Sequence, residues 1–386
     1  MRTYEEINSR IESGDAVVMT AEEVKAFAAE HGVEKVEREV DVVTTGTFGA
    51  MCSSGAFVNF GHSEPPIKMA KVWLNDVPSY AGLAAVDAYI GATELSESAP
   101  CGYGGAHVIE DLVSGKAVHL RAKAPGTDCY PRKDIDTYIS LRTVNQAYLY
   151  NPRNAYQNYA VATNSSDRVL YTYMGKLLPH NGNATFSSAG QLSPLLNDPQ
   201  LLTIGMGTKI FLGGGIGYVS WEGTQYKTNV PVRNGLPVGA ARTLAVMGDL
   251  RGMSPEYVRG LYFTGYGCSL GLGIGIPIPI LNGEIAKAVS VTEDQIFAQV
   301  LDYSVQSRAR KPIREVSYQE LRSGTIDIGG KEVRTSSLSS YRKALKIAKE
   351  LKEWIEKGQF DLVRPAGEFP AERSQKALEV LSCEEA

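Results

Sequence analysis

Two cysteines in polar, turn-rich loops are the residues of this chain best suited to chemistry. Cys52 lies in the glycine-bearing loop 44–55, and Cys129 lies in the loop 124–133, shortly before Arg132. A reactive thiolate is favoured by exposure, backbone amides and nearby cations, whereas a structural thiol usually lies within an apolar run. Both loops therefore suit reactive thiols, and Arg132 is expected to support the thiolate of Cys129.

A histidine and two further cysteines compete for a role. His62 lies ten residues beyond Cys52 and would serve as its acid or base partner if the chain folds back, although a surface histidine would give the same sequence. Cys101 also lies in a turn-rich loop, and its role stays open. Cys268 lies in an apolar, glycine-rich segment and is expected to pack. The five histidines are scattered without HExxH or Cys/His spacing, so no metal site is predicted.

The segment 145–159 is dense in amides and phenols and contains one arginine, Arg153, between Asn151 and Asn154. Such groups suit a zwitterionic ligand, and Arg153 would hold its carboxylate in a bidentate pair. Turn-forming asparagines with surface tyrosines would produce the same string. Both interpretations stay open, and Arg153, Asn151 and Asn154 are the candidate substrate-binding residues.

Glycine-rich stretches at 213–217 and 265–271 raise the alternative of a nucleotide site. Clustered backbone amides at a strand-to-helix turn bind phosphate, but neither stretch completes GxGxxG and no GxxxxGK[ST] occurs. A nucleotide-dependent oxidoreductase acting on a small aldehyde is therefore the second hypothesis. A ligand-binding or scaffold protein without catalysis is the third hypothesis. It ranks last, because it would make the presence of two exposed thiols in shaped loops accidental.

Composition limits the compartment and the partners. A chain of 386 residues with 43% apolar content can bury a large core, and its net charge of -4 includes no long basic block for nucleic acid. The odd number of cysteines, the absence of CxxC and an acidic start without a signal peptide indicate a reducing cytoplasm. The uncharged segment 261–282 contains glycines and prolines that favour buried strand and loop over a membrane span.

Helix and strand signals alternate along most of the chain, which predicts a mixed α/β fold with many short strands and glycine-rich loops. Thr3 with Glu6, and Thr20 with Glu23, have the spacing of capping boxes at two early helices. A first strand is expected at 40–44, which would place Cys52 near the carboxyl end of a strand.

We expect a catalytic domain over residues 1–310 and a mostly helical extension over residues 311–386. The composition becomes charged after about residue 308, and apolar residues recur with helical spacing from 340 to 358. Residues after Pro365 are expected to be loosely held.

Three long and specific stretches, 127–132, 149–159 and 202–217, carry a resemblance. Through them, residues 1 to about 330 resemble the homocysteine biosynthesis family of methanogens and other anaerobes, the L-aspartate semialdehyde sulfurtransferases. The resemblance implies conversion of L-aspartate semialdehyde to L-homocysteine through a cysteine persulfide, and it places the functional thiols at Cys52 and Cys129.

The resemblance also implies the cofactors and partners. No cofactor is expected to bind tightly, because the reaction uses sulfane sulfur or sulfide and an external electron donor. That donor would be an iron–sulfur ferredoxin-type protein, since this chain has no cluster-binding cysteine motif. Similar archaeal proteins often carry a pair of CBS domains, where this chain has a short charged tail. A cytoplasmic homo-oligomer is expected.

Overall fold

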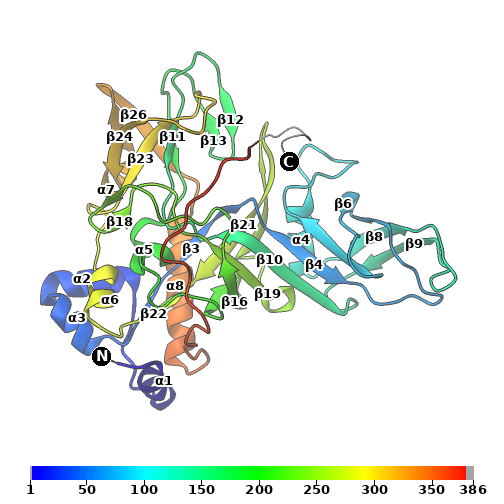
Figure 1. Ribbon diagram of the computed structural model, residues 1–386, viewed down its shortest axis with the longest axis horizontal. Helices are drawn as coiled ribbons and strands as arrows, with labels where there is room; N and C mark the ends of the chain where they lie inside the picture. Colours follow the sequence, from blue (N-terminus) through cyan, green and yellow to red (C-terminus); the bar gives the residue numbers. More distant parts are fainter. Residues whose placement is uncertain (1, 380–386) are drawn as a thin grey trace.

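A nine-stranded antiparallel sheet forms the centre of the protein, whose computed structural model describes residues 2–379 (Figure 1). Eight strands lie in the order β20 (Val258–Phe263), β21 (Gly267–Gly275), β15 (Lys209–Leu212), β16 (Gly215–Glu222), β19 (Leu244–Asp249), β10 (Gln146–Asn154), β4 (Gly55–Asn59) and β7 (Asp87–Gly91). The ninth strand, β3 (Thr47–Met51), pairs with β21 away from this path.

Smaller sheets surround the central one. The six-stranded sheet has the order β24 (Pro312–Ser317), β23 (Phe297–Asp302), β11 (Val161–Thr163), β14 (Ala184–Phe186), β26 (Lys331–Ser337) and β25 (Thr325–Ile328). The four-stranded sheet has the order β6 (Val77–Ser79), β5 (Lys71–Leu74), β8 (Val118–Lys123) and β9 (Asp134–Ile139). The remaining sheets contain β1 (Val18–Thr20), β2 (Val42–Thr44) and β22 (Pro277–Pro279), then β12 (Leu170–Thr172) with β13 (Gly175–Leu177), and β17 (Val232–Arg233) with β18 (Leu236–Pro237).

The helices lie among these sheets, so the prediction of a mixed α/β fold is confirmed. They are α1 (Tyr4–Ser13), α2 (Ala21–His31), α3 (Val33–Glu39), α4 (Gly105–Val113), α5 (Pro194–Asn197), α6 (Gly283–Val289), α7 (Tyr318–Arg322) and α8 (Tyr341–Glu356). The two predicted capping boxes are present at α1 and α2. The strand expected at 40–44 is present as β2, but it is the second strand. The short β1, three residues directly before α2, precedes it and gave too short a pattern to identify.

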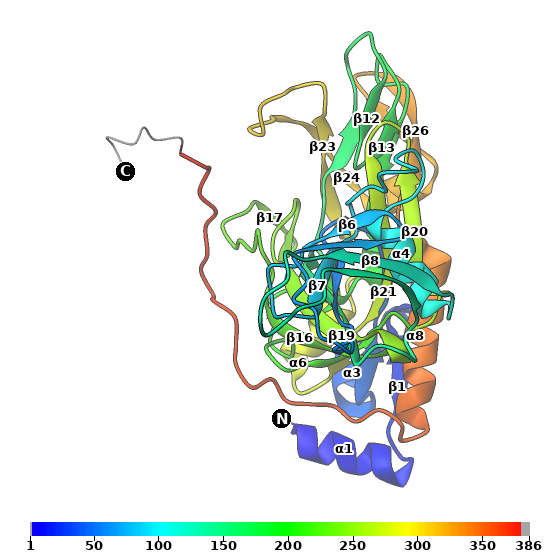
Figure 2. The same cartoon turned by 90° about the vertical axis from the view of Figure 1, so that its right-hand side faces the viewer.

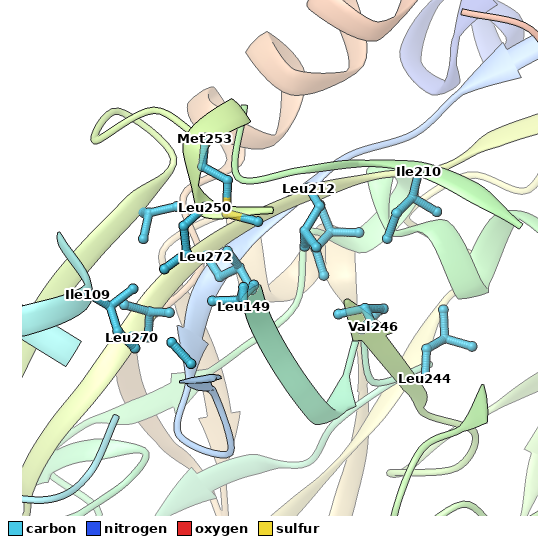
Figure 3. Packing of buried hydrophobic residues seen from close by; sticks show 14 of the residues in the cluster. Ile109, Leu149, Ile210, Leu212, Leu244, Val246, Leu250, Met253, Leu270 and Leu272 are labelled. Atoms are coloured by element: carbon cyan, nitrogen blue, oxygen red, sulfur yellow. The ribbon is translucent and has the colours of Figure 1, made fainter. Parts of the chain in front are cut away.

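The main core extends along the central sheet and includes residues of α4, of the four-stranded sheet and of α2, α3 and α6. Figure 3 shows apolar side chains of α4, β10, β15, β19 and β21 meeting there, and Leu149, Leu212 and Leu270 are fully buried. The predicted strand-and-loop structure of residues 261–282 is confirmed, since β21 and β22 are buried along their whole length.

Glycines let α8 approach the other face of β21. A Cβ atom added at Gly273 or Gly275 would lie 2.8 Å or 2.9 Å from the side chain of Ile347 on α8. At Gly46, just before β3, an added Cβ would lie 2.1 Å from the carbonyl oxygen of Ala344. The glycine-rich composition of this region therefore serves close helix-to-strand packing.

The two glycine-rich stretches form hairpin turns. Gly213 and Gly214 join β15 to β16 with φ angles of 62° and 98°, the left-handed conformation that a tight two-residue hairpin requires. The three residues 264–266 join β20 to β21 in a longer hairpin, in which Gly265 has a φ of 72°. Because neither stretch begins a helix, the phosphate-binding geometry on which the nucleotide hypothesis depended does not form at these positions.

The segment after residue 310 differs from the expected helical extension. It contributes β24, β25 and β26 as well as α7 and α8, and β24 pairs with β23 across the expected boundary. The predicted helix at 340–358 is confirmed as α8. Residues beyond Pro365 are not loosely held throughout, because Ala366 and Gly367 pair with the backbone of Met206.

Candidate active site

Cys52 occupies the turn between two strands of the central sheet. β3 ends at Met51 and β4 begins at Gly55, so the thiol lies at the end of an antiparallel strand. Asn151 of β10 supports this turn, because its Nδ2 atom donates a 2.8 Å hydrogen bond to Oγ of Ser54. Both side chains are buried, which makes the position of the turn rigid.

Two hydroxyl groups from the β20–β21 hairpin point at the sulfur of Cys52. Oγ of Ser269 donates a hydrogen bond of 3.3 Å to Sγ, and the hydroxyl of Tyr266 lies 3.9 Å from the same atom. Burial raises the pKa of Tyr266 to about 12, and the neighbouring thiol adds to this shift. The phenol therefore keeps its proton at neutral pH and can donate to an anionic sulfur.

Cys268 precedes Ser269 but faces the opposite side of β21, as alternation along a strand requires. Its Sγ lies 3.7 Å from Nδ1 of His107 on α4. Burial raises the pKa of the Cys268 thiol and lowers the pKa of His107, so the pair favours two neutral groups. The expectation that Cys268 packs in the core is confirmed, since it is 1% exposed.

A cavity of about 340 Å³ opens beside Cys52. Its cationic lining residues are Arg153, Lys227 and Arg308. Its hydroxyl-bearing lining residues include Ser187, Ser188, Ser193, Ser339, Tyr156, Tyr159 and Tyr173. A thiol, three cations and many hydroxyl groups therefore share one enclosure, which suits a small anionic ligand with oxygen atoms.

Tyr159 and Tyr173 line this cavity and are linked to each other and to Tyr303 through their phenol groups. The hydroxyl of Tyr173 lies 3.3 Å from that of Tyr159 and 3.2 Å from that of Tyr303. Burial raises the pKa of both Tyr159 and Tyr303 well above the ordinary value, so these phenols stay neutral. Neutral phenols can donate hydrogen bonds to a bound oxygen atom or to one another.

Of the three substrate-binding candidates, only Arg153 lines the cavity. Its Nε atom donates a 3.0 Å hydrogen bond to Oγ1 of Thr224, which holds the guanidinium at the rim. Asn151 and Asn154 are fully buried beneath the wall, where they bond to the backbone amides of Arg153 and Ala155 respectively. Their side-chain oxygens shape β10, Nδ2 of Asn151 holds Ser54, and Nδ2 of Asn154 is buried without a partner among the described residues. Neither residue lines the cavity.

The structure does not bring Cys129 to Cys52. Cys129 is exposed in the loop between β8 and β9, and the ring of its neighbour Tyr130 stacks on His62 with 6.1 Å between centroids. His62 follows the end of β4 whereas Cys52 precedes its start, and a five-residue strand separates its ends by about 13 Å. Figure 1 shows β8 and β9 far from β3.

Two supporting roles change with this placement. His62 is exposed and lies against the Cys129 loop, as the surface-histidine interpretation expected, while β4 separates it from Cys52. Arg132 donates from its guanidinium to the carbonyl oxygen of Glu64, which ties the Cys129 loop to the segment around His62. Cys101 is exposed elsewhere, and Cys383 lies outside the described residues.

Several site residues had no signal in the sequence. Ser269 and Cys52 are 217 positions apart, and Lys227 and Arg308 lie in irregular loops that match no motif. Tyr156 and Tyr159 did belong to the polar segment considered above. Ser269, Lys227 and Arg308 are recognised as parts of one site only from their positions in the folded protein.

Two features are absent from residues 2–379. No group of three or more His, Cys, Asp or Glu side chains in this range is arranged to hold a metal ion. No helix among these residues combines the length and the apolar character needed to cross a membrane.

Comparison with known proteins adds a family and close relatives. The family described as "homocysteine biosynthesis enzyme, sulfur-incorporation" matches residues 16–362. A Methanosarcina acetivorans protein named L-aspartate semialdehyde sulfurtransferase is 54% identical over 98% of this chain and 74% of its own length. A Methanocaldococcus jannaschii protein of the same name is 51% identical over 93% of this chain and 72% of its own length. No solved structure matches.

Proposed function

Because the chain belongs to the family of sulfur-incorporating homocysteine biosynthesis enzymes, we propose that it makes L-homocysteine from L-aspartate semialdehyde in the Cys52 cavity. The names of the two most similar relatives described above support this substrate. The observation that carries the proposal is the Cys52 thiol. Its sulfur accepts a hydrogen bond from the hydroxyl of Ser269, and it lines a cavity with three cationic side chains.

The cavity offers partners for the carboxylate and the aldehyde of this substrate. Arg153, Lys227 and Arg308 would bind its carboxylate, while the phenol of Tyr266 would donate to the aldehyde oxygen as negative charge develops there. The aldehyde carbon would then lie next to the sulfur of Cys52. Placing a nucleophile and its target in one enclosure accelerates their reaction by fixing their orientation.

The bond changes can be written from a Cys52 persulfide. Its outer sulfur attacks the aldehyde carbon, so a carbon–sulfur bond forms and the oxygen takes a proton. Two electrons and two protons cleave the sulfur–sulfur bond and release the Cys52 thiol. The remaining hydroxythiol loses water to give a thioaldehyde, which two further electrons and protons convert to the thiol of homocysteine. Sulfur supplied as sulfide needs only the second reduction.

Cys129 is the proposed entry point for sulfur. It is exposed, so a large sulfur donor can reach it, whereas Cys52 is partly enclosed. A persulfide on Cys129 would pass its outer sulfur to the Cys52 thiolate, which leaves a thiolate on Cys129 and consumes no electrons. Because the ends of β4 separate these cysteines within a chain, we place this exchange between Cys129 of one copy and Cys52 of another.

An external protein is the proposed source of electrons. The reductions described above need up to four electrons for each sulfane sulfur, and the thiols of this chain cannot supply them repeatedly. A ferredoxin-type iron–sulfur protein is a suitable donor because its clusters reach low potentials. No tightly bound cofactor of the enzyme itself takes part in these steps.

The test follows homocysteine formation by mass spectrometry from L-aspartate semialdehyde, a sulfane-sulfur donor and reduced ferredoxin. The wild type should form homocysteine, and Cys52→Ser should lower the rate by about a thousandfold because the attacking persulfide cannot form. Lys227→Ala should raise the KM about tenfold with a smaller effect on kcat. Full turnover by Cys52→Ser would show that the proposed mechanism is wrong.

A further inference from the structure

The C-terminal segment 366–375 lies against the back of the loop 223–231, which follows β16. The backbone nitrogen of Thr228 donates to the carbonyl oxygen of Arg373 at 2.9 Å, and the backbone nitrogen of Arg373 donates to Oγ1 of Thr228 at 2.9 Å. Nε2 of Gln375 donates to the carbonyl oxygen of Tyr226 at 2.6 Å. Figure 2 shows the tail passing β16 and β17 along one side of the molecule.

Side chains strengthen this contact. The ring of Phe369 meets that of Tyr226 edge-on with 6.1 Å between centroids, and the hydroxyl of Tyr226 donates to the carbonyl oxygen of Pro370 at 3.3 Å. Arg373 forms an ion pair with Glu222, the last residue of β16, whose side chain is 11% exposed. Nε of Arg373 donates to the same carboxylate at 3.1 Å.

The opposite side of this loop forms part of the Cys52 cavity. Gln225 and Lys227 line the cavity, while the residues that alternate with them, Tyr226 and Thr228, contact the tail. Gln225 has a φ of 67°, a left-handed conformation that costs free energy for a residue other than glycine. The loop therefore needs contacts that hold it in this shape.

The body of the protein contacts the loop through hydrogen bonds at its start and through the Tyr226 ring, which packs in the main core. The backbone nitrogen of Gly223 donates to the carbonyl oxygen of Thr243, and that of Thr224 donates to Pro152. From Tyr226 to Thr228, the hydrogen bonds that join the loop to another segment go to the tail. Lys227 lies in the middle of this part.

We propose that residues 366–375 are a positioning element of the active site, which holds Lys227 toward the Cys52 cavity to bind an anionic group of the substrate. This role rests on the proposed function only in the identity of the anion, because the cationic character of the cavity can be measured without the aldehyde. Arg373 and Glu222 are positioning residues, since their ion pair fixes the tail and neither lines the cavity.

The experiment compares the rates at which iodoacetate and iodoacetamide alkylate Cys52, with peptide mass spectrometry to assign the site. Iodoacetate carries a carboxylate, so the ratio of the two rates reports the cations near the thiol, and Cys129 in the same sample is an internal reference. Arg373→Glu repels Glu222 and frees the tail. Lys376→Glu makes the same charge change on a residue for which residues 2–379 provide no ion pair.

Arg373→Glu should lower the iodoacetate-to-iodoacetamide ratio at Cys52 at least about threefold, as expected when one solvent-accessible charge contact is weakened, and should leave the ratio at Cys129 unchanged. The exchange Glu222→Arg with Arg373→Glu should restore it. The proposal is overturned if Arg373→Glu matches Lys376→Glu, or if the exchanged pair has wild-type thermal stability but a low ratio. A lowered ratio in a protein that does not convert L-aspartate semialdehyde would retain this role and reject the substrate.

Discussion

At the scale of single residues, the Cys52 sulfur depends on one strong hydroxyl donor. Ser269 donates at 3.3 Å, whereas Tyr266 is more distant at 3.9 Å, so Ser269 should dominate the stabilisation of an anionic sulfur. We expect Ser269→Ala to lower the rate of Cys52 alkylation by iodoacetamide about five- to tenfold at pH 7. The measurement is peptide-resolved alkylation.

The adjacent residue provides the matched control for this prediction. Cys268 faces α4 and not the cavity, so Cys268→Ala should leave the alkylation rate of Cys52 within about twofold of the wild type. Equal effects of Ser269→Ala and Cys268→Ala would indicate a general disturbance of β21. In that case the hydroxyl of Ser269 would have no special role.

At the scale of elements, the approach of α8 to the segment before β3 determines stability. An alanine at Gly46 would place Cβ 2.1 Å from the carbonyl oxygen of Ala344, and neither backbone can move without displacing the helix. We expect Gly46→Ala to lower the free energy of unfolding by about 2 kcal/mol or more, as overpacking typically does. Urea-induced unfolding followed by circular dichroism would measure the change.

Gly91 at the end of β7 is the matched control, because no atom lies within 4 Å of an added Cβ there. Gly91→Ala should change the free energy of unfolding by no more than about 0.5 kcal/mol. If the two alanine variants had equal stability, the close approach of α8 would not need a glycine at position 46.

Local signals predicted elements well, and long-range contacts explain where prediction failed. The capping boxes of α1 and α2 and the apolar spacing of α8 lie within one helix each, so the sequence identified them. The contact between Cys52 and Ser269 spans 217 positions and left no pattern. For His62 the sequence left two interpretations open, and the structure agrees with the surface histidine, because β4 keeps the segment between Cys52 and His62 extended.

At the scale of the whole molecule, the many buried phenols should make the protein less stable at alkaline pH. Burial raises the pKa of Tyr341 to about 12 and raises the pKa of Tyr318 and Tyr159 further, whereas an unfolded tyrosine ionises near pH 10. Above pH 10 the unfolded chain releases protons that the native protein keeps, so stability is complete below pH 10 and falls as pH rises.

The expected loss is at least about 2 kcal/mol in the free energy of unfolding between pH 8 and pH 11. Urea titrations at these two pH values would measure it, with ionic strength held constant. A free energy of unfolding that stays level over this range would mean that the phenols ionise in the native protein as they do in the unfolded chain.

The separation of Cys52 and Cys129 leads to a second prediction for the whole molecule. If sulfur passes between copies, Cys52→Ala and Cys129→Ala should each be inactive alone. A mixed oligomer of the two, assembled by co-expression, should recover up to about a quarter of wild-type activity, because half of random dimers would have one complete pair out of two.

The control for this complementation mixes Cys52→Ala with a chain that lacks both thiols, and it should stay inactive. Failure of the first mixture to recover activity, although mixed oligomers are present by mass spectrometry, would place the transfer within one chain. The arm formed by β8 and β9 would then have to move toward β3.

The alternation of Cys268 and Ser269 along β21 has a chemical consequence for the enzyme's durability. Pairing with β20 and β3 fixes the register, so the thiol stays on the α4 side and the hydroxyl meets Cys52. A slip of one residue would reverse the two faces and place two thiols together in the cavity. Such neighbours can oxidise to a disulfide, whereas a thiol beside an alcohol cannot. The strand register therefore keeps Cys52, the sulfur on which the proposed mechanism depends, away from an internal oxidation.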